Sequence, residues 1–89
     1  MTIFSVMEDN PNPALREAIK AAFPDNYREL SPGRWLISAS GTAQQVSEKM
    51  GLVRGSGFGG TVVFATTSYY GLHSSDLWDW IREKLESDK

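Results

Sequence analysis

A strand and the start of a helix follow one another within residues 2–13, TIFSVMEDNPNP. Thr2–Met7 is apolar and β-prone and stops at the acidic, turn-forming residues 8–11, EDNP, so it predicts a strand with at least one buried face. Asn12 is typical of a helix cap, and Pro13 suits the first helical position, where the missing N–H of proline costs nothing. The sequence therefore predicts a strand that ends in a carboxylate pair and leads straight into a helix.

The next elements read as a helix and a hairpin. Apolar residues recur every three or four positions up to Phe23, which predicts an amphipathic helix ended by Pro24. Tyr27–Leu30 and Arg34–Ala39 predict two strands joined by a turn at Ser31-Pro32-Gly33. Together these segments extend the pattern to strand, helix, strand, strand.

The second half of the chain repeats the helix and strand signals. Thr42 and Gln45 match a capping box, and Gly51 is placed to end that short helix. After a glycine loop, Thr61–Tyr69 is the most β-prone stretch, and we expect this strand to be central or well covered. A last helix is predicted after a cap at Ser74 or Ser75, with apolar positions at Leu77, Trp78, Ile81 and Leu85, before a tail that frays.

This order predicts the fold class. A β-α-β-β-α-β pattern is typical of the α+β, ferredoxin-like fold, in which two helices cover one face of a four-stranded antiparallel sheet. We expect one domain over residues 1–89, with an additional C-terminal helix. The second sheet face is then covered either by that helix or by a second subunit.

Composition narrows the function classes. Nine Lys and Arg against eleven Asp and Glu give a net charge of -2, which argues against strong nucleic-acid or anionic-membrane binding. The absence of Cys excludes disulfides, Cys-ligated zinc, iron–sulfur clusters and thiol catalysis. No apolar run reaches the ~18 residues of a spanning helix and the start lacks a signal-peptide pattern, so we expect a cytoplasmic protein without membrane contact.

The carboxylate pair at the end of the first strand is the first candidate site. Asp9 could hold a divalent cation such as magnesium, especially if a symmetry mate supplied a second copy. Alternatively, Asp9, Asn10 and Asn12 cap the following helix and complement its dipole. The sequence favours capping, because Glu8 and Asp9 would face opposite ways on an extended strand.

The glycine loop is the second candidate. Residues 55–60, GSGFGG, formally match G-x-G-x-x-G, but here the loop follows a helix and precedes a strand, the reverse of a dinucleotide site. A flexible connector is favoured, with Gly55, Gly57 and Gly60 giving the loop its freedom. Arg54 beside it is expected to be solvated, although it could contact a phosphate as a single charge.

A single histidine and a surplus of aromatic residues complete the candidates. His73 lies between the last strand and the last helix and lacks the G-x-S-x-G elbow of a serine hydrolase, so a loop residue is favoured over a catalytic one. Tyr69, Tyr70 and Trp80 are candidates for an interface, because Tyr and Trp are enriched at protein interfaces. We therefore expect self-association.

A family resemblance rests on the element order, the acidic exit of the first strand, and the segment Arg34-Trp35-Leu36-Ile37-Ser38 before a Thr-capped helix. In these features Thr2–Tyr69 resembles the Cas2/VapD group of ferredoxin-like proteins and the small SinR-like proteins. The resemblance implies a homodimer with sheets facing one another. In the nuclease-like members it implies an Asp at the end of the first strand, which would fall on Asp9.

Three functions stay open at this point. The favoured one is a noncatalytic homodimeric interaction or regulatory protein without a cofactor, whose partner is a second copy or another protein. The second is a metal-dependent ribonuclease that uses Asp9 at a dimer axis with magnesium or manganese. The third is a small-ligand or peptide-binding module with the glycine loop as a lid.

Overall fold

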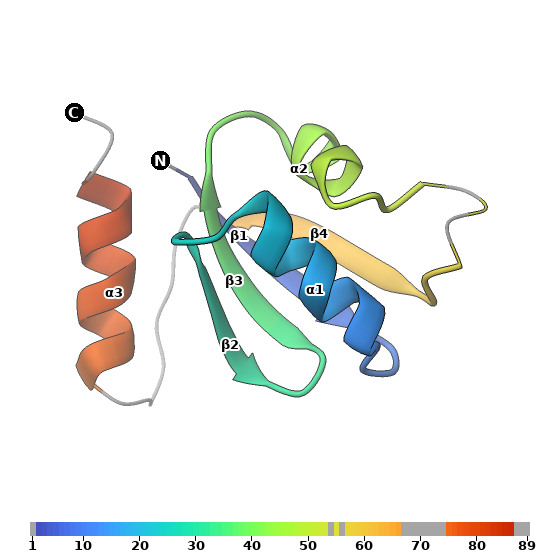
Figure 1. The fold of residues 1–89 in the computed structure, drawn as a ribbon. Helices are drawn as coiled ribbons and strands as arrows, with labels where there is room; N and C mark the ends of the chain where they lie inside the picture. The colour runs from blue at the N-terminus through green and yellow to red at the C-terminus, as the bar shows by residue number, and fades with distance from the viewer. Residues whose placement is uncertain (1, 54, 56, 67–74, 87–89) are drawn as a thin grey trace.

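The computed structural model describes residues 2–53, 55, 57–66 and 75–86 (Figure 1). The predicted order of elements is confirmed over these residues, and the element bounds are as follows: β1 (Thr2–Glu8), α1 (Pro13–Ala22), β2 (Tyr27–Ser31), β3 (Arg34–Ala39), α2 (Ala43–Lys49), β4 (Thr61–Thr66) and α3 (Ser75–Glu86). The last part of the predicted fourth strand, 67–69, lies outside the described residues.

The strands form one antiparallel sheet in the order β2-β3-β1-β4. The expectation that the fourth strand is central or well covered is wrong, because β4 is an edge strand of the described sheet and exposes Val62 and Phe64. Strand propensity reports that side chains fit a pleated surface, and it does not say which side of a strand receives a neighbour. The α+β class and the four-stranded antiparallel sheet are confirmed.

Helices α1 and α2 lie on the same face of the sheet (Figure 1). On that face the central strands contribute Phe4 and Val6 from β1, and Trp35 and Ile37 from β3, all buried. The helices meet them with a further set of buried apolar side chains: Leu15, Ile19 and Val46. Spacing of three or four residues brings such side chains to one stripe of a helix, so the amphipathic pattern explains this core.

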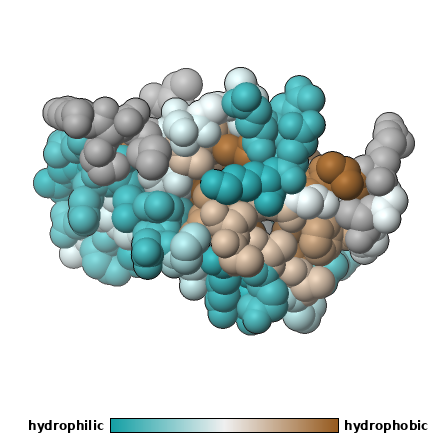
Figure 2. All heavy atoms as spheres, turned by 45° about the horizontal axis from the view of Figure 1, so that its top comes forward, coloured by the Kyte–Doolittle hydropathy of each residue, from teal (hydrophilic) through white to brown (hydrophobic). Residues whose placement is uncertain are grey.

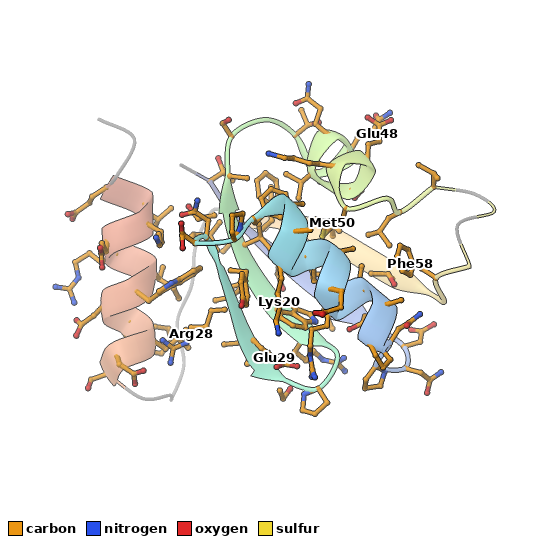
Figure 3. All side chains as sticks on the ribbon, viewed as in Figure 1. Lys20, Arg28, Glu29, Glu48, Met50 and Phe58 are labelled. Carbon is orange, nitrogen blue, oxygen red and sulfur yellow. The ribbon has the colours of Figure 1, made fainter. Side chains whose placement is uncertain are left out.

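Helix α3 lies against the opposite face. Ile3 and Leu36 alternate along their strands with the core residues, so they point away from α1 and α2, and they pack against Leu77 and Ile81 of α3. Arg28 of β2 also reaches α3, where its guanidinium donates to the Asp76 carboxylate over 2.6 Å (Figure 3). The C-terminal helix therefore covers part of its own sheet.

None of the helices in the described part of the chain is both long enough and apolar enough to span a bilayer.

The turn between β2 and β3 depends on one glycine. Gly33 is buried and has φ +83°, a left-handed conformation that costs an L-residue with a Cβ atom about 1–2 kcal/mol. Its carbonyl accepts a hydrogen bond from the backbone N–H of Glu8 over 2.9 Å. The turn thus joins the hairpin to the end of β1, where the candidate site lies.

We predict that Gly33→Ala lowers the free energy of unfolding by about 1–2 kcal/mol, because alanine is strained at this φ. Urea denaturation followed by circular dichroism measures the change. Gly59→Ala is the matched control, because a Cβ atom there would meet no atom within 4 Å and no left-handed φ is involved. Equal losses in the two variants would contradict this account of the turn.

Candidate functional site

The end of β1 places two adjacent carboxylates in opposite environments. Glu8 is only 4% exposed and shares the core face of the strand with Phe4 and Val6. Its Oε1 accepts a hydrogen bond from the backbone N–H of Asn12 at 3.0 Å, and its Oε2 accepts one from the indole N–H of Trp35 at 3.2 Å. The buried carboxylate therefore has a donor for each oxygen and links β1 to α1 and β3.

A small hollow lies beside Glu8. It measures about 110 Å³ and is lined by residues of the strand ends and of the first turn of α1: Glu8, Pro11, Asn12, Pro13, Arg16, Glu29, Gly33 and Trp35. Arg16 and Glu29 form an ion pair at 2.8 Å, and the Arg16 guanidinium lies 5.9 Å from the Trp35 ring centroid. The positive charge is already paired, so we assign this group to the packing of α1 on the sheet.

Asp9 points the other way and is exposed. Its backbone N–H donates to the Gly60 carbonyl at 2.8 Å, and its side chain lies directly against Gly60. The cap of α1 is Asn12, whose Oδ1 accepts from the Ala14 N–H at 2.9 Å. The capping role is confirmed for Asn12, and no hydrogen bond joins the Asp9 side chain to another described residue.

Among the described residues, no group of three or more His, Asp or Glu side chains is arranged to hold a metal ion. The described part of one chain therefore does not provide Asp9 with two further carboxylate or imidazole ligands. A metal at this position would need ligands from a second copy, from solvent or from a substrate.

An apolar surface adjoins Asp9 on the second sheet face. Register places Met7 of β1 beside Val62 of β4 on one side and beside Arg34 of β3 on the other. Phe64 follows Val62 on the same face of β4. We call Met7, Val62 and Phe64 the open corner, because their side chains are 41%, 49% and 53% exposed while α3 covers only the Ile3 and Leu36 part of this face.

The open corner is hollowed and carries one charge of each sign at its rim. A shallow depression of about 390 Å³ is lined by its three residues and by Glu8, Asp9 and Arg34. The Arg34 Nη1 donates to the carbonyl oxygens of Glu8 and Gly33 at 3.0 and 3.2 Å, which leaves further guanidinium donors available. An apolar floor between Asp9 and Arg34 is suited to binding a protein surface.

The structure places the other predicted site residues apart from this corner or outside its description. Gly55 and Gly57 are exposed with φ near +84° and +88°, which fits the predicted connector. Trp80 is half-buried and packs against the cluster under α3. The remaining candidates lie outside the described residues: Arg54, Tyr69, Tyr70 and His73.

Two features of this region were not predicted from the sequence. The burial of Glu8 could have been found from alternation, because Phe4, Val6 and Glu8 fall on one side of a regular strand. The open corner could not be predicted without the order of the strands in the sheet. Met7 and Val62 are far apart in the chain and become neighbours only when β1 and β4 pair.

The chain was compared with protein-family models, with curated proteins and with solved structures, and no match was found in any of the three comparisons.

We predict that Asn12→Ala lowers the free energy of unfolding by about 1 kcal/mol, because the cap of α1 loses its acceptor. Asp9→Ala should change it by less than about 0.5 kcal/mol, since this exposed side chain does not cap the helix. Thermal and urea unfolding of both variants measure the difference. A loss in Asp9→Ala as large as that in Asn12→Ala would show that Asp9 supports the helix after all.

Proposed function

We propose that this chain is a noncatalytic interaction module that acts as a homodimer, with the open corners of two copies packed against each other. The observation that carries the proposal is the open corner itself. Three large apolar side chains lie side by side on a sheet and are 41–53% exposed. Contiguous apolar surface with a polar rim marks interaction sites, whereas single exposed apolar residues do not.

Charge at the rim favours a second copy as the partner. In a two-fold interface each residue of one copy meets a different residue of the other, and the contact is repeated by symmetry. Asp9 and Arg34 line the same depression, so a two-fold axis through the open corner can bring Asp9 of each copy to Arg34 of the other. One surface then supplies both halves of two ion pairs.

The order and direction of the strands support a ferredoxin-like assignment of the fold. β1 and β2 are both antiparallel to β3, which lies between them, so they are parallel to each other and joined through α1. This is the split β-α-β arrangement. On the sheet face opposite α1 and α2, α3 packs on Ile3 and Leu36 and leaves the open corner exposed to a partner.

We predict that Phe64→Glu dissociates the dimer. The substitution removes an apolar contact worth about 1.5–3 kcal/mol from each of two copies, which corresponds to a dimer at least about 100-fold weaker. Light scattering coupled to size exclusion, over a dilution series, measures the change. Circular dichroism should stay unchanged, because Phe64 is 53% exposed in the single chain.

Val53→Glu is the matched control, because Val53 is an equally exposed apolar residue, at 55%, away from the open corner. It should leave the dimer intact. A second experiment reverses the charges at the rim of the open corner. Asp9→Lys and Arg34→Glu should each weaken the dimer, and the double variant should restore it. A wild-type chain that stays monomeric at every concentration would refute the proposal.

A second candidate function is favoured by the exposed, non-capping carboxylate of Asp9. A two-fold axis near the open corner would bring two Asp9 side chains into one region, and Mg²⁺ needs only one or two carboxylates besides water and substrate phosphates. Such a dimer would be a metal-dependent ribonuclease. The cation would compete with Arg34 of the partner for Asp9, so the two functions differ in their response to metal.

If the second function holds, single-stranded RNA should be cleaved in the presence of Mg²⁺ or Mn²⁺, and Asp9→Asn should abolish cleavage while the fold persists. A fluorescent oligonucleotide assay measures this. Cleavage that survives in Asp9→Asn would come from another residue or from a contaminant. For the first function, we expect a dimer whose stability is unchanged by either metal and no cleavage.

A further inference from the structure

The two flanks of α3 face different parts of the molecule. Asp76, Trp80 and Lys84 are four residues apart and form one stripe of the helix. Asp76 pairs with Arg28 of β2, and the Lys84 ammonium donates to the Asp25 carbonyl and to Asn26 Oδ1, each at 3.1 Å. This stripe therefore faces the β2 side of the sheet.

The other flank faces the open corner. Leu77 and Ile81 lie along the line of contact with the sheet, and Trp78, Arg82 and Leu85 form the stripe beyond it. Trp78 is partly buried at the edge of the cluster, and Leu85 is 37% exposed. The flank that looks across the sheet towards β1 and β4 is thus partly apolar.

The outward side of α3 is charged. Asp79, Glu83 and Glu86 are exposed there. The Asp79 carboxylate pairs at 2.9 Å with Arg82, which lies at the border between this side and the flank. Among the described residues at the left of Figure 2, where α3 lies, hydrophilic ones predominate. A partner sheet is therefore not expected to lie on top of α3, and contact is expected beside it.

The two edges of the sheet also differ. The β2 edge carries Arg28 and Glu29 and a register shift between Glu29 and Ser31, features that discourage strand pairing. The β4 edge, TVVFAT, has no charge, no proline and a regular register with β1. An edge of that kind is unprotected unless another element covers it.

The diameter of a helix and the distance between stacked sheets indicate where α3 would lie relative to a partner sheet. A helix with its side chains is about 10–12 Å across, and stacked sheets lie about 10 Å apart. A partner sheet packed on the open corner would therefore lie in the same layer as α3 and beside it. Its outermost strand on that side would be β4, because β4 carries two of the three residues of the open corner.

We infer that α3 of each copy covers the β4 edge of the other, through the flank formed by Trp78, Arg82 and Leu85. This inference rests on the proposed homodimer and extends it by giving the C-terminal helix a role in the interface. Each second sheet face is then covered jointly, by its own α3 over Ile3 and Leu36 and by the partner over the open corner. The outer side of β4, with which no described strand pairs, is covered in the same step.

Cross-linking between two differently labelled chains tests the inference, and the absence of native Cys makes it specific. One chain carries Arg82→Cys on the inferred flank, and the other carries Ala65→Cys on exposed β4. The two are mixed and treated with a short bismaleimide. At about 10 micromolar chain we expect hetero-cross-links to form about 100-fold faster than between unassociated chains, since effective concentrations within a complex are about millimolar.

Glu83→Cys replaces Arg82→Cys as the control, because it is exposed on the same helix but outside the inferred flank. It should cross-link to Ala65→Cys at the background rate. Light scattering on the same mixtures separates the two proposals. A dimer in which Arg82→Cys and Glu83→Cys react equally slowly overturns the role of α3 and leaves the homodimer standing, whereas a monomer overturns both.

Discussion

The carboxylate of Glu8 joins three elements of this fold at one point. It is 4% exposed and accepts hydrogen bonds from the first turn of α1 and from the indole of Trp35 on β3. A buried carboxylate without partners would cost several kcal/mol, so the donors that satisfy it also determine how the helix and the strand meet β1. This contact turns the next residue outward, and the exposure of Asp9 follows from the burial of Glu8.

The sequence predicted the helices and their caps well, because these features depend on residues close together in the chain. The capping box at Thr42 forms as expected, with Thr42 accepting from the Gln45 N–H at 3.1 Å and Gln45 Oε1 accepting from the Thr42 N–H at 2.9 Å. The amphipathic spacing of α1 likewise buries Leu15 and Ile19. Both features depend on residues within two turns of one another, which a sequence displays directly.

The position of β4 in the sheet and the packing position of α3 could not be predicted from the sequence, because both depend on contacts between residues far apart in the chain. A β-branched run fits a central or an edge strand equally well, and only pairing with β1 settles where it lies. The apolar stripe of α3 would suit its own sheet or that of a partner. The ion pair between Arg28 and Asp76 joins residues far apart in the chain, so no local sequence pattern predicts it.

The central position of β1 has a consequence for biosynthesis. β1 is translated before the other three strands of the sheet, yet Ile3 at its start pairs with Thr66 on β4. The β2 and β3 hairpin can form early and offer β1 one neighbour, but its other side stays unpaired until β4 has been translated. Until then the nascent chain exposes one side of an apolar strand, and unpaired strand edges of this kind make folding intermediates prone to aggregation.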